Sequence, residues 1–320
     1  MAWIVGVDEA GYGPNLGPFV MTSVACRVPD CHGSADLWQL LQSAVRRATD
    51  ADDGRLLLDD SKRVYVKRGI AGLERGILTT LAGANRSLPS TLAALLETWC
   101  PEDGDEIRRE AWYRGTSPLP LHLDADAWQT AASHFAQVGS ENAINDWRLH
   151  AVLVCPSRFN ELIEESGSKG HVLGDSLSRL LRALLGDLPG EDAASIFVDK
   201  HGGRNTYAAM LQHALPKGNV LTERESMANS TYRVQGLGRP LRLTFQPRAD
   251  AEHLCVALAS MASKYLRELL MLEFNRFWRE HVPDLKPTAG YPVDAVRFLQ
   301  AIRPTLAQLG LSEQSVWRRK

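Results

Sequence analysis

An apolar run that ends in two adjacent carboxylates, and then in glycines, opens this chain of 320 residues. Residues 4–14 read IVGVDEAGYGP. A short apolar run of this kind is typical of a buried strand. Side chains at the end of a strand in an α/β sheet lie at the rim where ligands bind. The segment therefore predicts a buried strand that presents Asp8 and Glu9 to water and to a cation.

The bulk composition is that of an ordinary globular protein. Hydrophobic residues make up 44% of the chain and charged residues 23%, which is enough for a sizeable core in one large domain or two modest ones. The formal net charge is -2. This value excludes a global basic field, so any contact with nucleic acid has to depend on a local patch.

Two classes of protein are not expected from this sequence. No apolar run approaches eighteen residues, and the first one lacks a basic segment before it and is interrupted at Asp8, so neither a membrane span nor a signal peptide is predicted. The cysteines are odd in number and include no C-x-x-C pair, which favours reduced thiols over disulfides or a zinc site. We therefore expect a cytoplasmic protein. The five cysteines are Cys26, Cys31, Cys100, Cys155 and Cys255.

The order of the predicted elements indicates an α/β fold, with a mixed sheet flanked by helices. Strands are expected at 2–7, 19–28, 149–155 and 194–198, with a hairpin at 231–236 and 240–246. Helices are expected at 35–48, 66–82 and 250–280. We assign 1–84 and 148–282 to the catalytic core, 85–147 to a helical insertion of unknown role, and 283–320 to a C-terminal helical extension.

Two further acids stand out. Asp199 ends the apolar run 194–198, as Asp8 ends the first one. Glu268 lies on the apolar face of the long predicted helix, between Tyr265 and Leu272. Burying an ionised acid there is costly unless a cation compensates. Alternatively, Glu268 pairs with Lys264, four residues earlier on the helix.

Gathered together, Asp8, Glu9, Asp199 and Glu268 would supply the oxygen ligands that Mg²⁺ or Mn²⁺ prefers. Two such ions can activate a water and stabilise the leaving oxygen of a phosphodiester without a protein nucleophile. Asp250 lies 18 residues before Glu268. That separation is about 27 Å along a helix, so Asp250 and Glu268 cannot bind the same metal ion. We therefore expect Asp250 to cap the helix or to pair with a basic residue.

Glycines and basic residues surround the predicted acids. Gly11, Gly13 and Gly17 precede a strand rather than a helix, which disfavours a dinucleotide fingerprint. They form either a tight turn or a surface for close approach of backbone amides to a phosphate. His201 is either a proton relay or a loop residue without a role. The tail 317–320, sequence WRRK, is expected to fray.

Five motifs, in this order, resemble those of the type 2 ribonucleases H (ribonuclease HII and its relatives). They cover about 1–84 and 148–295. The motifs are Gly6-Val7-Asp8-Glu9-Ala10-Gly11-Tyr12-Gly13-Pro14, Asp60-Ser61-Lys62, Phe197-Val198-Asp199, 259–268 with the sequence ASMASKYLRE, and Gly290-Tyr291-Pro292.

The resemblance implies a ribonuclease H-like fold and cleavage of RNA within RNA–DNA hybrids, or at ribonucleotides embedded in duplex DNA. It implies two Mg²⁺ or Mn²⁺ ions, 5′-phosphate and 3′-hydroxyl products, and nucleic acid as the partner, with no obligate protein partner. The implied metal ligands are Asp8, Glu9, Asp199 and Glu268. The implied substrate-binding residues are Gly11, Tyr12, Gly13, Ser61, Lys62, Lys264, Arg267 and Tyr291.

The chain departs from the family pattern at two positions. Tyr12 stands where the family has arginine between its glycines, and Glu268 where it usually has aspartate. Two other functions fit parts of the sequence. One is an ATP-dependent phosphotransferase of the actin and sugar-kinase type, suggested by 6–8 and 198–203. The other is a non-catalytic module that binds hybrids.

Overall fold

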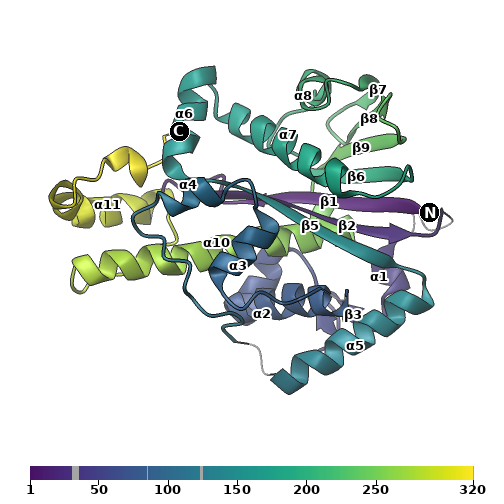
Figure 1. Cartoon of the computed structure of the whole chain (residues 1–320), viewed down its shortest axis with the longest axis horizontal. Helices are drawn as coiled ribbons and strands as arrows, with labels where there is room; N and C mark the ends of the chain where they lie inside the picture. The colour runs from purple at the N-terminus through teal and green to yellow at the C-terminus, as the bar shows by residue number, and fades with distance from the viewer. Residues whose placement is uncertain (31–35, 85, 123–124, 320) are drawn as a thin grey trace.

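The computed structural model describes residues 1–30, 36–84, 86–122 and 125–319. A seven-stranded mixed sheet lies between two layers of helices (Figure 1). The predicted fold class, a mixed α/β sheet flanked by helices, is confirmed. Four of the five cysteines are buried free thiols, and Cys31 lies outside the described residues. In the described part of the chain, no helix has the length and apolarity needed to cross a membrane.

The elements follow one another along the chain as strands that alternate with groups of helices. The strands are β1 (Ala2–Ala10), β2 (Phe19–Val28), β3 (Val45–Arg46), β4 (Leu56–Leu57), β5 (Asn145–Val154), β6 (Ala193–Asp199), β7 (Asn219–Glu225), β8 (Ser230–Gln235) and β9 (Leu241–Gln246). The helices are α1 (Leu37–Leu40), α2 (Ser61–Gly83), α3 (Leu92–Trp99), α4 (Gly104–Arg108), α5 (Ala125–Glu141), α6 (Pro156–Ser166), α7 (Lys169–Asp187), α8 (Ala208–Ala214), α9 (Ala249–Glu252), α10 (Leu254–His281) and α11 (Pro292–Gln308).

The centre of the sheet is parallel and its two sides are antiparallel. The strand order is β5-β2-β1-β6-β9-β8-β7, with β1, β6 and β9 parallel to one another. Val7 pairs with Val198, and Asp199 pairs with Gln246. The carboxyl ends of the three central strands therefore meet at one edge of the sheet.

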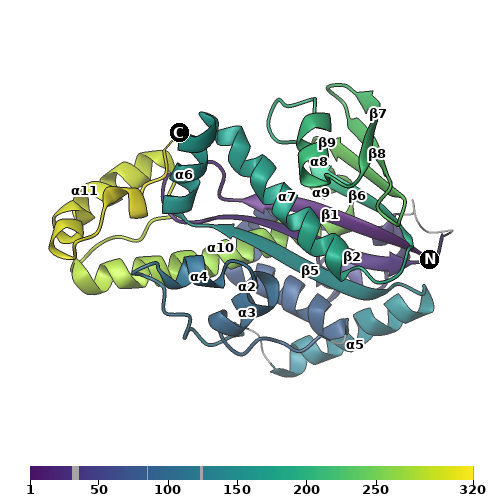
Figure 2. The ribbon, with the colours of Figure 1, turned by 45° about the horizontal axis from the view of Figure 1, so that its top comes forward.

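Successive side chains of β1 point to opposite faces of the sheet and contribute to two separate layers of the core. Trp3, Val5 and Val7 face α7 and α8, whereas Ile4 faces the layer that contains α2, α3 and α10. Figure 2 shows α6, α7 and α8 on one side of the sheet and α2, α3, α5 and α10 on the other. Because successive side chains of a strand point to opposite faces, Asp8 faces the layer of α10 and Glu9 the layer of α7.

The region from 35 to 58 differs from the prediction. The helix expected at 35–48 is wrong: α1 ends at Leu40, and the chain then pairs β3 with β4. The amide of Leu56 donates to the carbonyl of Ala44 (2.9 Å), and that of Leu58 to Arg46 (3.0 Å). These bonds satisfy backbone groups that a continuing helix would have to pair locally.

The segment 85–147 does not form a core of its own. Leu92 and Leu95 of α3, together with Phe135 of α5, belong to the same apolar cluster as α10. Its short helices agree with the prediction, although β5 already begins at Asn145. The boundaries assigned to the insertion, to the core and to the extension stay a prediction.

The backbones of β1 and α10 approach each other closely at Gly6. A Cβ built on Gly6 would lie 2.1 Å from the carbonyl carbon of Cys255 and 2.1 Å from the amide nitrogen of Val256, both in α10. No side chain fits there, because backbone atoms cannot move aside as the end of a flexible side chain can. Glycine is therefore required for α10 to lie against β1.

Replacing Gly6 tests this contact. We expect Gly6→Ala to lower the free energy of urea-induced unfolding by about 3 kcal/mol or more, because overpacking against backbone forces the helix away from the sheet. Gly186→Ala is the matched control, since Gly186 lies in α7 with nothing within 4 Å of the added Cβ. The control should match or slightly exceed the parent, and an equal loss in both variants would contradict the interpretation.

Candidate functional site

Two acids lie side by side at the carboxyl ends of the central strands. The parallel register that pairs Val7 with Val198 places Asp8 of β1 next to Asp199 of β6. Both side chains face the layer of α10, because Ile4 and Phe197, at even spacing from them, pack there. Asp8 is buried, and its Oδ1 accepts from the amide of Glu9 at 2.8 Å.

The long helix α10 covers Asp8. Ser263 donates to the carbonyl of Asp8 at 3.0 Å and lies 2.8 Å from the hydroxyl of Thr22. Burial raises the pKa of Asp8 well above its ordinary value, and the charge of Glu9 raises it further, whereas a hydrogen bond from Ser260 lowers it. The pKa of Glu9 rises to about 7, through burial and then through the charge of Asp199.

Asp250 is the fourth acid of this cluster. The chain leaves β9, turns through Arg248 in the left-handed region (φ 59°) and enters α9, where the amide of Ala249 donates to Asp199 Oδ1 at 3.1 Å. This turn carries Asp250 back to the ends of β6 and β9. Burial raises the pKa of Asp250 to about 6, with contributions from the charges of Asp60 and Asp199.

The start of α2 brings a cation to these acids. Asp60 caps the helix by accepting from the amide of Lys62 at 2.8 Å. Ser260 of α10 donates to the hydroxyl of Ser61 at 3.0 Å. The positive charge of Lys62 lowers the pKa of Glu9, of Asp199 and of Asp250 against the larger effect of burial.

Glu268 does not belong to the cluster, so its assignment as a metal ligand is corrected. It forms an ion pair with Lys264 at 3.0 Å and accepts from the hydroxyl of Tyr65 at 3.2 Å. It lies five residues beyond Ser263, the residue of α10 that contacts Asp8, which is about 7.5 Å of helix rise. The pairing of Glu268 with Lys264 that the sequence left open is the arrangement found.

Asp250, expected to cap the helix or to pair with a basic residue, lies instead beside the strand ends, where the charges of Asp60 and Asp199 raise its pKa. Asp250 follows β9, and β9 is parallel to β6, so Asp250 returns to the edge at which Asp199 lies. The sequence showed β8 and β9 only as a hairpin, without the strand that β9 pairs with on its other side. The predicted helix 250–280 also breaks at His253, which is extended.

The four carboxylates supply the hard oxygen donors that a divalent cation requires. As placed, no three acidic, histidine or cysteine side chains in the described residues come close enough to hold a metal ion. The carboxylates of Asp8 and Asp199 instead accept from nearby backbone amides. The raised pKa values show that ionising these acids together is unfavourable, and a bound cation would offset that cost. The donor set therefore fits a hard divalent ion.

Two buried arginines donate hydrogen bonds to carbonyl groups of the glycine-containing turn between β1 and β2. Arg267 of α10 donates to the carbonyls of Leu16 (3.2 Å) and Pro18 (3.3 Å). Arg318, which is 1% exposed, donates to the carbonyl of Gly11 at 2.6 Å and to that of Pro14. Arg267 thus positions the turn, and its predicted contact with phosphate is wrong for this arrangement.

The C-terminal tail is bound, so the prediction that it frays is wrong. The amide of Arg318 donates to the carbonyl of Asn15 at 2.7 Å, and Asn15 Nδ2 donates to the carbonyl of Arg318 at 3.0 Å. Leu16 and Trp317 form an antiparallel bridge. The guanidinium of Arg318 also lies 4.6 Å over the ring of Phe159. Lys320 lies outside the described residues.

Two tyrosines lie at this turn. Tyr12 packs edge-to-face on Phe19 with ring centroids 6.3 Å apart, and Lys169 lies 4.5 Å over its ring. Tyr291 is 55% exposed at the start of α11, directly after Gly290, whose carbonyl accepts from the amide of Asn15 at 2.7 Å. Gly13 has nothing within 4 Å of an added Cβ, so the outer side of the turn is open.

His201 is a packed residue of the loop after β6. It is buried, and its ring lies edge-to-face with Tyr207 and Phe245, with centroids 5.8 and 6.2 Å apart. Burial, and then the charge of Arg204, lower its pKa to about 4. A histidine whose pKa is lowered this far accepts a proton poorly, and neither of its ring nitrogens has a hydrogen-bond partner among the described residues, so this environment favours the structural alternative over a relay.

Three solved structures are similar to this chain. They are an RNase HII from Archaeoglobus fulgidus in a complex with PCNA (15% identity, 99% of this chain and 94% of that chain, TM-score 0.42), the ribonuclease H2 from Pyrococcus horikoshii OT3 (14%, 98% and 92%, 0.44) and Bst-RNase HIII in complex with Mn²⁺ (14%, 99% and 66%, 0.44).

All three come from the family that the sequence motifs resemble. No family model and no curated protein sequence matches the chain. Because every TM-score is below 0.5, the proposals below rest on the geometry of the site.

The raised pKa of Glu9 predicts a pH-dependent stability. An acid whose pKa is raised in the folded state destabilises it as pH rises from about 4.5, the ordinary value, to about 7. We expect Glu9→Gln to be more stable than the parent at pH 8, by on the order of 1–3 kcal/mol without divalent ions. The gain should vanish near pH 4.5.

Urea unfolding in a chelator-containing buffer at several pH values measures this difference. Glu97→Gln, an exposed position on α3, is the control and should show no pH-dependent gain. A Glu9→Gln gain that is the same at pH 4.5 and pH 8 would contradict the electrostatic origin.

The buried tail predicts a local effect of Arg318→Ala. The substitution removes both donors to the turn, so we expect faster hydrogen exchange in residues 11–18 and a loss of about 1–3 kcal/mol in stability. Arg319→Ala is the control, because Arg319 pairs with Glu164 in solvent and is worth at most about 1 kcal/mol. Unchanged exchange at the turn in Arg318→Ala would show that the tail does not hold it.

Proposed function

We propose that this chain is a metal-dependent endonuclease of the ribonuclease H type. Its substrate would be the RNA strand of RNA–DNA hybrids, or a ribonucleotide embedded in duplex DNA, with 5′-phosphate and 3′-hydroxyl ends as products. One observation supports the proposal: four acids, Asp8, Glu9, Asp199 and Asp250, lie at or just after the carboxyl ends of three parallel strands, and the charge of Lys62 lowers the pKa of the last three.

In this proposal Asp8, Glu9, Asp199 and Asp250 hold the cations, and Asp250 takes the place first assigned to Glu268. Two Mg²⁺ or Mn²⁺ ions bound there would activate water and stabilise the leaving oxygen. The four side chains fix the ions at one edge of a rigid sheet. Burial of Asp8 under α10 limits the water that competes for its oxygens.

The other proposed contacts surround the acids. Lys62, at the start of α2, presents a cation, and the helix N-terminus itself favours a phosphate. The hydroxyl of Ser61 is buried against Ser260, so Ser61 would contribute through its place in the first turn of the helix. In this proposal the turn of Gly11, Tyr12 and Gly13 faces the substrate, with its open side at Gly13, and the exposed ring of Tyr291 offers a surface for a sugar. Lys264 would reach phosphate only by leaving Glu268.

The two alternative functions fit the geometry less well. A phosphotransferase of the actin type would need an open phosphate loop at Gly6, but the backbone of α10 covers this glycine. A non-catalytic module would also place the four acids near the phosphates of a bound nucleic acid. Carboxylates and phosphates repel each other unless cations lie between them. Both points favour catalysis with bound ions.

Paired substitutions test the proposal and the corrected assignment together. We expect Asp250→Asn, like Asp8→Asn, to lower cleavage of a duplex with one ribonucleotide by on the order of 10³-fold or more, because each removes an oxygen that holds an ion. Glu268→Gln should stay within about tenfold of the parent, because Glu268 forms a partly buried pair with Lys264 and holds no ion in this proposal.

The assay compares this duplex with an all-RNA/DNA hybrid, while Mg²⁺ and Mn²⁺ are titrated separately. Chelation should abolish cleavage and either ion should restore it. Full activity of Asp8→Asn would reject the enzyme proposal. Loss in Glu268→Gln together with full activity in Asp250→Asn would restore the original ligand assignment.

A further inference from the structure

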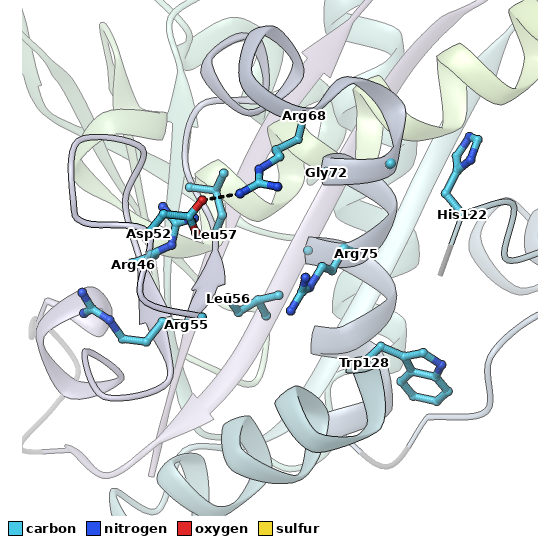
Figure 3. A pocket seen from close by; sticks show the side chains of 13 residues that line it. Arg46, Asp52, Arg55, Leu56, Leu57, Arg68, Gly72, Arg75, His122 and Trp128 are labelled. Carbon is cyan, nitrogen blue, oxygen red and sulfur yellow. Dashed lines mark hydrogen bonds and ion pairs between the residues drawn. The ribbon is translucent and has the colours of Figure 1, made fainter. Parts of the chain in front are cut away.

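A cavity of about 380 Å³ lies apart from the acids, between the β3–β4 loop and the second half of α2. Its size is within the range of small-ligand sites. Arginines from three elements line it: Arg46 from β3, Arg55 from the end of the loop, and Arg68 and Arg75 from α2 (Figure 3). Trp128 of α5 and His122 complete the wall.

The local fold holds these residues in place. α2 has a break at Gly69 (φ 60°, ψ −155°), directly after Arg68, so the two parts of the helix differ in direction. Beyond the break, the buried Glu74 accepts from the amides of Leu121 (2.8 Å) and His122 (2.6 Å) and from the hydroxyl of Tyr265 (2.8 Å). The cavity is therefore walled by elements that are fixed to the core.

The cavity carries an excess of positive charge. Asp52 pairs with both Arg46 and Arg68, and Arg55 pairs with Asp53 outside the cavity at 2.8 Å. Arg75 is exposed and has no hydrogen bond or ion pair to the part of the chain that the structure describes. The guanidiniums of Arg46 and Arg68 thus share the carboxylate of Asp52, and that of Arg75 has no carboxylate partner among the described residues.

Arg46 is the unusual member of this set. Its side chain is 4% exposed, and its Nε is buried without a hydrogen-bond partner among the described residues. A buried charged donor without a partner is costly. Its other contact, Asp52, is 57% exposed on a surface loop that turns at Gly54 (φ 90°). An exposed carboxylate on a surface loop is therefore what neutralises a buried guanidinium.

We propose that this cavity binds a phosphate-bearing ligand of the nucleotide class, and that Asp52 occupies the position of its phosphate in the free protein. Guanidinium groups bind phosphate through paired, charge-assisted hydrogen bonds, which suits Arg46 and Arg68 once Asp52 swings out. Arg75 supplies a third cation, and Trp128 offers a flat ring for a base. The ligand is either a free nucleotide or a nucleotide within a single strand.

Calorimetric titration measures this binding directly, with pyrophosphate, a nucleoside 5′-diphosphate and a short single-stranded DNA as probes at low ionic strength. We expect Arg68→Gln/Arg75→Gln to bind at least about tenfold more weakly than the parent, since two charge-assisted contacts are lost. Asp52→Asn should bind severalfold more tightly, because it frees the guanidiniums. Both arginines of the double variant are exposed, so its fold should persist, as circular dichroism will check.

Arg279→Gln is the matched control, because Arg279 is exposed near the end of α10 and lines no part of the cavity. It should bind like the parent. Tighter binding of the diphosphate than of DNA identifies a free nucleotide as the ligand, and the reverse order identifies a strand. Absence of binding by both the parent and Asp52→Asn, or equal binding by the double variant, overturns the proposal.

The same titration in an Asp8→Asn background separates this site from the acidic cluster. Binding of the diphosphate should persist there, because Asp8 lies at the end of β1 and lines no part of the cavity. Loss of binding in that background would show that the probe sits at the acids and would overturn the second site. If the protein fails to cleave the nucleic-acid substrates, the proposed nuclease activity is rejected, but the measured binding of the diphosphate still decides the proposal for the cavity.

Discussion

The contact between α10 and β1 is the constraint on which the rest of the structure depends. Gly6 lets the backbone of α10 lie directly against β1. Residues further along α10 then contact the end of β1 and the turn that follows it. Ser263 reaches the carbonyl of Asp8, and Arg267 reaches the turn after β1. One helix therefore sets the position of the strand end and of the turn beside it, so that the acids and the open glycines are fixed relative to each other.

Placing four carboxylates near the carboxyl ends of the central strands costs free energy when they are ionised. Burial raises the pKa of Asp8, Glu9, Asp199 and Asp250, and for Asp8, Glu9 and Asp250 a neighbouring carboxylate raises it further. A fold that evolved only for stability would place apolar or neutral side chains there. The cost is understandable if the site is completed by cations, since ions at the strand ends convert mutual repulsion into attraction.

Sequence patterns located the strands of this edge but not every side chain that reaches it. Asp8 and Asp199 were found because each directly ends an apolar run, and that relation is local. Asp250 was missed because its place depends on the parallel pairing of β9 with β6, which no local pattern encodes. Glu268 does lie at the spacing of the predicted apolar face of α10. However, Leu272, the last residue of that predicted face, is 46% exposed, so the buried face ends before Leu272.

The tail and the loop before α2 were mispredicted for a related reason. Arg318 looks like a terminal solvated residue, and only its hydrogen bonds to the carbonyls of a turn 300 residues earlier make its burial favourable. The segment 42–46 contains helix-compatible residues, but backbone bonds to 56–58 determine its structure. In both cases distant backbone partners decide the outcome, and such partners leave no trace in the composition of the segment itself.

The helix α2 joins the two regions of the molecule that attract anions. Its first turn presents Lys62 to the acids, and Arg68 and Arg75, on either side of the break at Gly69, line the cavity. Arg75 lies thirteen residues after Lys62, on the far side of the break at Gly69. A chain with a net charge of only -2 thus carries separate basic regions on one element, and the neutral total conceals them. For such a protein, the arrangement of charges along each element says more about its ligands than their sum does.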